Sequence, residues 1–333
     1  MTTDTQSSAA TIPSFLEIEA AASRIEAMCE ETPLLESPAL NARLKGRLLV
    51  KAECLQKTGS FKLRGAFNRF SMLTEDERRR GAVAVSSGNH GQAVAYAARA
   101  LGTTAIVVMP VDAPKTKIEA ISALGAKVVL HDREKGDLED VGRELAEKQN
   151  LVLVPPANDP AIMAGAGTVG REIVHQAARL GANLDALLVC CGGGGLTAGC
   201  AISLRALSPL TAVIAVEPVG FDDTARSLAA GRRMRNEASA RTICDALKSP
   251  TPAALPFEVH KTHLSGTLAV SDDEVVSAMR TAAREFGLVV EPGGAVALAA
   301  VLSGRHDVEG RTVAVTLTGR NIGLEAVARH YGE

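Results

Sequence analysis

The sequence lacks tryptophan, has few aromatic residues and carries almost balanced charge. Only 3% of its 333 residues are aromatic, and the formal net charge is −2. Proteins that bind single-stranded nucleic acid use aromatic stacking surfaces, and both nucleic acids and anionic membranes attract strongly basic chains. We therefore expect neither a nucleic acid nor a membrane as a partner.

Cysteine pairs with metal-binding spacing are also missing. The six cysteines include no Cys-x-x-Cys pair, so we expect free thiols in a reducing compartment. The first ten residues are polar and contain no lysine or arginine, unlike a secretory signal. The apolar runs are too short to cross a bilayer. Together these absences predict a cytoplasmic protein.

Short apolar runs rich in β-branched residues alternate with helical patterns along the chain. Because the runs are continuously apolar, they predict strands buried on both faces, as in parallel sheets covered by helices. The expected fold class is α/β, with doubly wound open parallel sheets and helices on both faces. The expected strands are Leu48–Glu53, Ala82–Ser86, Thr104–Met109, Lys127–His131, Leu151–Val154, Ala186–Cys191, Thr211–Glu217 and Arg311–Leu317.

The length and the order of these patterns predict two domains. A chain of 333 residues exceeds what one hydrophobic core usually serves. We expect residues 81–158 to form a small domain inserted into a large domain made of residues 1–80 and 159–333. Capping boxes predict helices that begin after Ser14, Thr74 and Ser271, the first of them running toward Glu30.

Lys62 occupies an unusual position for a lysine. It follows a glycine-containing turn at the expected start of a helix. The positive end of the helix dipole and the apolar ring of Phe61 both favour the neutral amine. A neutral amine is a nucleophile that can hold an aldehyde as a Schiff base. An ordinary solvated lysine on an amphipathic helix is the alternative.

Four polar or glycine-rich segments follow predicted parallel strands. Ligands of open parallel sheets bind beyond the carboxyl ends of the strands, so these segments are expected to share one site. They are the turn leading to Lys62, Ser86–Gly91, Gly192–Gly195 and Thr318–Asn321.

The four glycines Gly192, Gly193, Gly194 and Gly195 lie between a predicted strand and a predicted helix. Exposed backbone N–H groups and the helix N-terminus can bind a phosphate there. A tight turn without a ligand is one alternative. A second is a dinucleotide site, because Gly193, Gly195 and Ala198 match G-x-G-x-x-A and Glu217 ends the next strand. That second alternative implies a nicotinamide-dependent oxidoreductase.

Taken together, these segments resemble the fold type II pyridoxal-phosphate enzymes, in particular the threonine dehydratase and serine racemase branch. The resemblance covers residues 18–321 and implies the two-domain architecture of the tryptophan synthase β subunit. The motifs that carry it are Gln56-Lys-Thr-Gly-Ser-Phe-Lys-Leu-Arg-Gly65, Ser86-Ser-Gly-Asn-His-Gly91, Gly192–Gly195 and Glu291-Pro-Gly-Gly294.

The resemblance implies a role for each cofactor-binding residue. Lys62 would carry pyridoxal 5′-phosphate as a Schiff base and then remove the α-proton of the substrate. Phe61 would pack on the pyridine ring, and Asn89 would hydrogen-bond the ring hydroxyl. Gly192–Gly195 would bind the phosphate, and the hydroxyl of Thr318 would face the pyridine nitrogen.

The resemblance also implies where the substrate binds. Its carboxylate would lie on the loop Ser86, Ser87, Gly88, Asn89 and His90. Ser87 would act as a second acid or base in a racemase and as a carboxylate contact in a dehydratase.

Two further residues, Glu291 and Arg320, lie in motifs near this expected site. Glu291 is a possible contact with substrate or cofactor. Arg320 stands where the family normally has glycine, so it either points to solvent or recognises a substrate larger than threonine.

The segment Glu217-Pro-Val-Gly-Phe-Asp-Asp223 resembles the cation loop of the same family. Glu217, Asp223 and the carbonyl of Phe221 would supply oxygen ligands to Mg²⁺ or Ca²⁺. The ion would stabilise the fold and take no part in the reaction. Two solvated acids in a loop are the alternative.

The expected activity is that of a lyase that dehydrates and deaminates a 3-hydroxy amino acid to a 2-oxo acid and ammonia. Serine, threonine, hydroxyaspartate and phenylserine are candidate substrates. An amino-acid racemase is the alternative within the family, and a ligand-sensing protein without turnover is a non-enzymatic one. We expect a homodimer or a higher homo-oligomer. The chain ends at Glu333, so no regulatory domain is expected.

Overall fold

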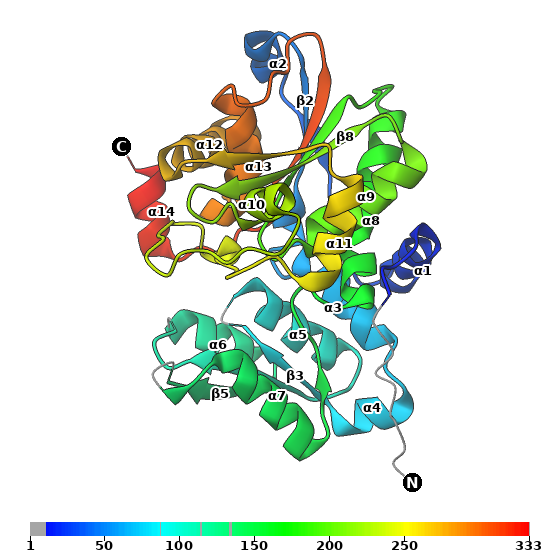
Figure 1. The fold of residues 1–333 in the computed structure, drawn as a ribbon, viewed down its shortest axis with the longest axis vertical. Helices are drawn as coiled ribbons and strands as arrows, with labels where there is room; N and C mark the ends of the chain where they lie inside the picture. The colour runs from blue at the N-terminus through cyan, green and yellow to red at the C-terminus, as the bar shows by residue number, and fades with distance from the viewer. Residues whose placement is uncertain (1–10, 87, 114, 133–134, 333) are drawn as a thin grey trace.

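The computed structural model describes residues 11–86, 88–113, 115–132 and 135–332. Figure 1 shows two lobes, each built around its own sheet. The larger sheet has the order β1-β2-β10-β7-β8-β9, and the smaller one has the order β5-β4-β3-β6. Every pair is parallel except β1 with β2. The predicted fold class is confirmed.

All eight predicted strands are present, and the chain adds two more. The large sheet contains β1 (Leu34–Glu36), β2 (Arg47–Lys51), β7 (Ala186–Cys190), β8 (Ala212–Pro218), β9 (Gly266–Val270) and β10 (Thr312–Thr316). The small sheet contains β3 (Ala82–Val85), β4 (Ala105–Pro110), β5 (Lys127–His131) and β6 (Val152–Leu153). The additional strands, β1 and β9, form the two edges of the large sheet.

The helices begin where the capping boxes predict. Ser14, Thr74 and Ser271 each cap the helix that follows them. The first helix ends at Ile25 and does not continue to Glu30. The helices are α1 (Phe15–Ile25), α2 (Pro38–Leu44), α3 (Lys62–Ser71), α4 (Glu75–Arg80), α5 (Asn89–Ala100), α6 (Lys115–Ala123), α7 (Leu138–Gln149), α8 (Pro160–Arg179), α9 (Gly195–Leu207), α10 (Asp223–Ala230), α11 (Ala254–His263), α12 (Asp272–Phe286), α13 (Pro292–Leu302) and α14 (Leu324–Tyr331), with short 3₁₀ turns η1 (Glu53–Leu55) and η3 (Asp245–Leu247).

Helices cover both faces of the large sheet, and strand residues alternate between two cores. On β10, Val313 and Val315 pack in the core that contains α12 and α13. Ala314, between them, packs in the core formed with α8 and α9. This arrangement explains why the central strands are continuously apolar, because neither face meets water.

Helix α3 joins the two lobes. It follows β2 of the large sheet, yet Leu63, Phe67 and Phe70 pack in the core of the small lobe with residues of α5. The small sheet uses strands from residues 82–153 alone. The division into domains at 80/81 and 158/159 stays a prediction, because α3 precedes it and shares this core.

Across the described residues, no helix has both the length and the apolar character that spanning a membrane requires.

Candidate active site

Lys62 is the first residue of α3. The chain leaves β2 at Lys51, passes through η1 and turns at Gly59, whose φ is +74°. The Lys62 side chain is half-buried, and its Nζ donates a hydrogen bond to the carbonyl of Pro156 at 2.8 Å. Burial lowers the pKa of the amine to about 8. A much larger fraction of this amine is therefore neutral near pH 7 than for an exposed lysine.

The ring of Phe61 lies next to this amine. Lys62 Nζ is 5.0 Å from the centre of the ring. Phe61 occupies the N-cap of α3 and makes no side-chain capping bond. Its backbone N–H donates to the carbonyl of Thr318 at 3.1 Å. This bond fixes Lys62 and Phe61 beside the end of β10.

The glycine loop connects β7 to α9. Gly194 is the N-cap of α9, has a φ of +89° and provides no side-chain capping bond. A Cβ at Gly194 would come 2.6 Å from Cε1 of His260, and one at Gly195 would come 3.2 Å from Cα of Ala157. Gly194 requires glycine, because its φ is positive and a Cβ would collide with His260, and the first N–H groups of α9 are not used by a capping side chain. Such a helix N-terminus favours an anion.

A connecting segment brings Lys62 close to the glycine loop. Pro156 accepts the hydrogen bond from Lys62, and the next residue, Ala157, packs against Gly193 and Gly195. The amine and the glycine loop thus contact adjacent residues of one segment. Sequence reasoning missed this segment, because two prolines and an alanine carry no reactive group.

Asn89, at the start of α5, reaches across to the large lobe. Its Nδ2 donates to Oε1 of Glu291 at 2.6 Å, and its Oδ1 accepts from Nδ2 of Asn321 at 2.6 Å. Glu291 is buried, and burial raises the pKa of its carboxyl to about 7. The structure therefore joins three residues from the predicted motifs. Sequence reasoning named Asn89 and Glu291 and missed the role of Asn321.

The loop before α5 is described only in part. Ser86 Oγ accepts a hydrogen bond from the N–H of Gly88 at 3.2 Å. Ser87 lies outside the described residues. His90 is buried, with Nε2 at 2.9 Å from the carbonyl of Val154. Burial, and secondarily the charge of Lys62, lower the pKa of His90 to about 3. Its ring is therefore neutral and hydrogen-bonded within the small lobe, so a substrate would meet this residue through its backbone.

Thr318 and Arg320 follow β10 in different environments. Thr318 is buried, and its N–H donates to the carbonyl of Gly294 at 3.2 Å. Arg320 is exposed, and its side chain makes no hydrogen bond or ion pair within the described parts of the chain. The exposure of Arg320 agrees with a side chain that points to solvent, and recognition of a substrate larger than threonine stays a prediction.

The predicted cation ligands lie between the end of β8, which contains Glu217, and the start of α10 at Asp223. The two carboxylate oxygens of Glu217 accept backbone N–H groups from Thr224 and Ala225 at 2.9 and 3.1 Å. Oδ1 of Asp223 accepts from Asn236 at 2.6 Å. Its buried Oδ2 has no partner among the described residues.

Burial raises the pKa of Glu217 to about 8 and that of Asp223 to about 6. The proximity of the two carboxylates raises the pKa of Glu217 further. The donor set fits a cation that would neutralise them. However, the described residues contain no group of three or more His, Cys, Asp or Glu side chains placed to hold a metal. Backbone carbonyls such as that of Phe221 and water would have to complete the coordination.

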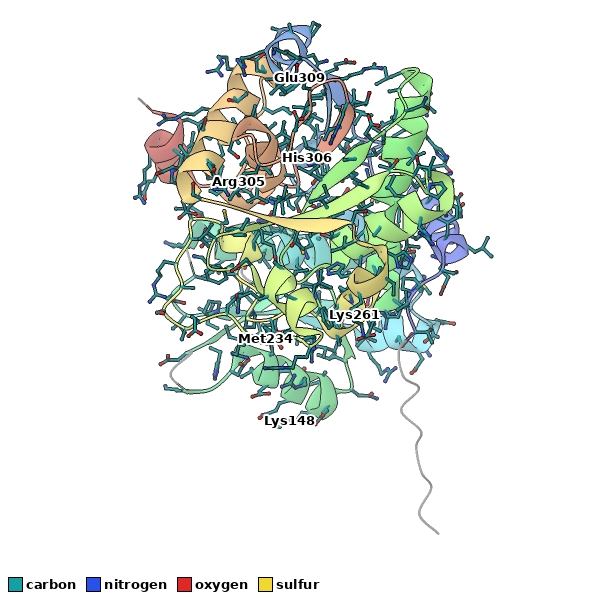
Figure 2. The ribbon with its side chains drawn as sticks, turned by 45° about the horizontal axis from the view of Figure 1, so that its top comes forward. Lys148, Met234, Lys261, Arg305, His306 and Glu309 are labelled. Carbon is teal, nitrogen blue, oxygen red and sulfur yellow. The ribbon has the colours of Figure 1, made fainter. Side chains whose placement is uncertain are left out.

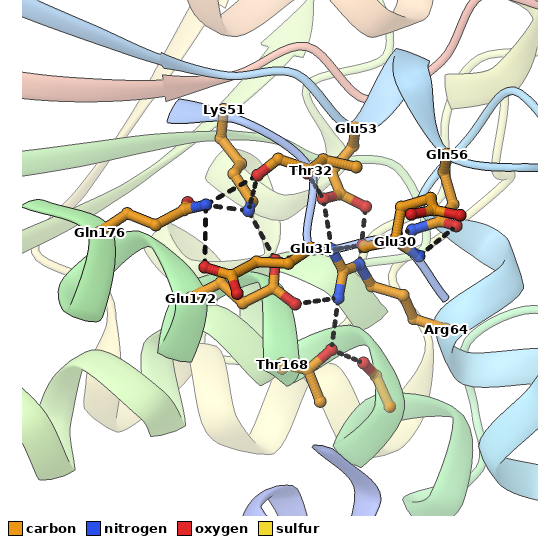
Figure 3. A network of polar contacts seen from close by, with 12 residues as sticks. Glu30, Glu31, Thr32, Lys51, Glu53, Gln56, Arg64, Thr168, Glu172 and Gln176 are labelled. Atoms are coloured by element: carbon orange, nitrogen blue, oxygen red, sulfur yellow. Dashed lines mark hydrogen bonds and ion pairs between the residues drawn. The ribbon is translucent and has the colours of Figure 1, made fainter. Parts of the chain in front are cut away.

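Below the site, buried charges hold α3 against β2 and α8 (Figure 3). The guanidinium of Arg64 forms two hydrogen bonds of 2.8 Å with Glu53 and further bonds of 2.6 and 2.8 Å with Glu172. Lys51 Nζ donates to Glu172 at 2.6 Å and to Gln176 at 2.9 Å. Glu172 and Gln176 lie four residues apart on α8 and therefore share one face of that helix. Sequence reasoning missed this network, although charged residues at the end of an apolar strand were a signal for it.

The fold and these groups define a class of enzyme. A lysine with a lowered pKa, a glycine loop at a helix N-terminus and a flat apolar ring fit an aromatic aldehyde with a phosphate tail. The sequence model of the family described as "Pyridoxal-phosphate dependent enzyme" matches residues 25–319. The chain belongs to this family, and pyridoxal 5′-phosphate is its cofactor.

Individual relatives resemble the chain over nearly its whole length. The L-threo-3-hydroxyaspartate ammonia-lyase of Pseudomonas sp is 38% identical, over 95% of this chain and 98% of that protein. The serine racemase of Schizosaccharomyces pombe is 33% identical, over 95% and 97%. The solved structure of the serine racemase from Dictyostelium discoideum is 36% identical, covers 94% of this chain and 99% of that one, and superposes with a TM-score of 0.86. A solved threonine deaminase is 44% identical over the same shares of the two chains, with a TM-score of 0.88.

These comparisons confirm the predicted family, fold type, cofactor and general enzyme class, a pyridoxal-phosphate-dependent lyase. They do not support the nicotinamide alternative.

Proposed function

We propose that this protein is an ammonia-lyase that converts a 3-hydroxy amino acid to a 2-oxo acid and ammonia. The observation that carries this proposal is the Lys62 amine, whose pKa burial lowers to about 8. This amine lies beside the ring of Phe61 and next to the segment that contacts the glycine loop. When bound, pyridoxal 5′-phosphate supplies the electron sink for the reaction. Serine, threonine and 3-hydroxyaspartate are the first substrates to test.

Each of these residues would have a separate role toward the cofactor or the substrate. Lys62 would hold the cofactor and then move the α-proton of the substrate through its Nζ. Gly192–Gly195 would bind the phosphate through backbone N–H groups, and Phe61 would pack on the ring. Asn89 would donate to the ring hydroxyl, and Thr318 would face the ring nitrogen.

The backbone N–H groups of Ser86–His90, just before and at the start of α5, together with the hydroxyls of Ser86 and Ser87, would orient the substrate carboxylate. They would hold the α-C–H bond toward Lys62. Ser87 belongs to this loop by its position in the sequence.

A racemase remains the second candidate, because relatives named serine racemase are 33% and 36% identical. D-amino acid that accumulates faster than 2-oxo acid would favour the racemase.

The Lys62→Ala variant tests the main proposal. It should lose covalent attachment of the cofactor, detected as a borohydride-stable adduct on the Lys62 peptide, and release no measurable 2-oxo acid from any of the three substrates. Lys57→Ala is the matched control, since Lys57 lies five residues earlier and its Nζ pairs with Glu30 at 3.3 Å. A Lys62→Ala protein that keeps adduct and turnover would refute the assignment.

We further propose that Glu217, Asp223 and the Phe221 carbonyl bind Mg²⁺ or Ca²⁺. This proposal is supported by Asp223 Oδ2, which is buried without a hydrogen-bond partner among the described residues, and by the raised pKa values of Glu217 and Asp223. Added Ca²⁺ should raise the thermal unfolding midpoint of the wild-type protein and EDTA should lower it, by a few degrees. The Asp223→Asn variant should respond to neither. Equal responses of both proteins would contradict the site.

The remaining expectations concern assembly and compartment. We propose a homodimer or higher homo-oligomer, supported by large apolar side chains on the surface of this chain, such as Leu16 and Leu324, with 78% and 86% exposed. Sedimentation at micromolar concentration would test this, and a monomer would contradict it.

We propose the cytoplasm as the compartment, supported by six buried free cysteines. Localisation of a tagged chain to another compartment would contradict that proposal.

A further inference from the structure

The Asn89 side chain is held by groups from the large lobe. Its Oδ1 accepts one hydrogen bond from Asn321, and its Nδ2 donates one to Glu291, both at 2.6 Å. A side-chain amide has two N–H donors and one acceptor oxygen. One N–H of Asn89 is therefore left for a ligand after these two bonds are made.

The direction of these hydrogen bonds is fixed at one end by the backbone. Asn321 Nδ2 also donates to the carbonyl of Thr58 at 2.9 Å. A carbonyl can only accept, so the nitrogen of Asn321 must face Thr58, and the same nitrogen then faces Oδ1 of Asn89. The opposite orientation of the Asn89 amide would bring two donors together at Asn321.

At the other end, the protein accommodates Glu291 closely. Its carboxyl group is buried, and a Cβ at Gly319 would come 2.0 Å from Oε1 and 3.1 Å from Nδ2 of Asn89. Any residue other than glycine at position 319 would displace this contact. Gly319, between β10 and Asn321, therefore leaves the space that the Glu291–Asn89 hydrogen bond needs.

We propose that Glu291 and Asn321 are positioning residues that orient the Asn89 amide, so that its second N–H stays available to the ring hydroxyl of pyridoxal 5′-phosphate. This inference rests on the proposed function, in which Asn89 contacts that hydroxyl. It assigns Glu291 a role through Asn89, in place of direct contact with substrate or cofactor.

Two cofactor probes separate positioning from general structural support. The apo-protein is titrated with pyridoxal 5′-phosphate and with 3-deoxypyridoxal 5′-phosphate, which lacks the ring hydroxyl, and each Kd is measured. Asn321→Asp cannot donate to Asn89, and Glu291→Leu cannot accept from it. Each variant should raise the Kd for pyridoxal 5′-phosphate about three- to tenfold, which corresponds to the loss of one hydrogen bond. Both variants should change the Kd of the second probe less than twofold.

A conservative variant and a reference variant complete the design. Glu291→Gln keeps an acceptor for Asn89 and should bind both probes like the wild-type protein. Asn89→Ala should show the same hydroxyl-dependent loss as Asn321→Asp. Circular dichroism of each apo-protein checks folding, and if Glu291→Leu does not fold, Asn321→Asp decides the question.

If Asn321→Asp raises the Kd of both probes equally, the inference is overturned, because a structural defect does not depend on the ring hydroxyl. Loss in neither probe would overturn it as well, and so would an Asn89→Ala variant without a hydroxyl-dependent loss. All three outcomes leave the ammonia-lyase proposal intact. That proposal fails separately, if wild-type protein forms no covalent adduct at Lys62.

Discussion

Two positive side chains at the start of α3 lie two residues apart in opposite electrostatic environments. The guanidinium of Arg64 is buried between the carboxylates of Glu53 and Glu172 (Figure 3), which hold the pKa of Arg64 well above its usual value. The amine of Lys62 donates to one backbone carbonyl and forms no ion pair with any carboxylate in the described residues. Burial without a counterion lowers its pKa. The same helix end thus holds one permanent cation for structure and one amine that can be neutral for chemistry.

The largest effect should come from breaking the charge network at Glu53. Burial alone would raise the pKa of Glu53, but Arg64 holds it below its usual range, so the carboxylate is ionised and paired. The Glu53→Gln variant leaves Arg64 with reduced compensation in a buried site. We expect a loss of about 3–5 kcal/mol in the free energy of unfolding, measured by urea denaturation of the apo-protein.

The matched control uses the same chemistry at the surface. Arg47 forms two hydrogen bonds of 2.9 Å with Glu36, and both side chains are about 30% exposed, at 31% and 28%. Glu36→Gln should cost less than about 1 kcal/mol. If the two variants lose equal stability, the buried network contributes no more to stability than the surface pair. The structural role assigned to Arg64, in contrast to Lys62, would then be wrong.

The sequence was enough to predict most of the architecture and the main chemical groups. Continuous apolar runs predicted eight strands, because strands covered on both faces by helices have no polar side. The edge strands β1 and β9 were missed, since both are only partly buried and β1 has only three residues. Lys62 and the glycine loop were predictable because a lysine or four glycines at a helix start are unusual in their own right.

The contacts between distant segments could not be predicted from the sequence. The hydrogen bond from Lys62 to Pro156 spans 94 residues, and that from Asn89 to Glu291 spans 202. Both depend on how the lobes meet, and neither partner has a local pattern that indicates the other. The motifs therefore predicted which groups are present, and the tertiary structure determines how they are oriented.

The pKa of Lys62 can be compared directly with that of a surface lysine. Lys148, on α7, is exposed and labelled at the edge of the small lobe in Figure 2. Its hydrogen bond to Glu144 raises its pKa, whereas burial lowers that of Lys62 to about 8. Trace acetylation of the apo-protein across pH 6–11, read by peptide mass spectrometry, should give a midpoint near 8 for Lys62 and a higher midpoint for Lys148.

The sign of the shift also predicts an effect on stability. Between the pKa of folded Lys62 and the usual value near 10.4, the unfolded chain binds more protons than the folded one. The contribution of this group to stability therefore increases as the pH rises through that window. In Lys62→Met the increase should disappear, while in Lys148→Met it should remain. A Lys62 midpoint equal to that of Lys148 would show that burial does not lower the pKa of this amine, and the two cations of α3 would then differ in their partners alone.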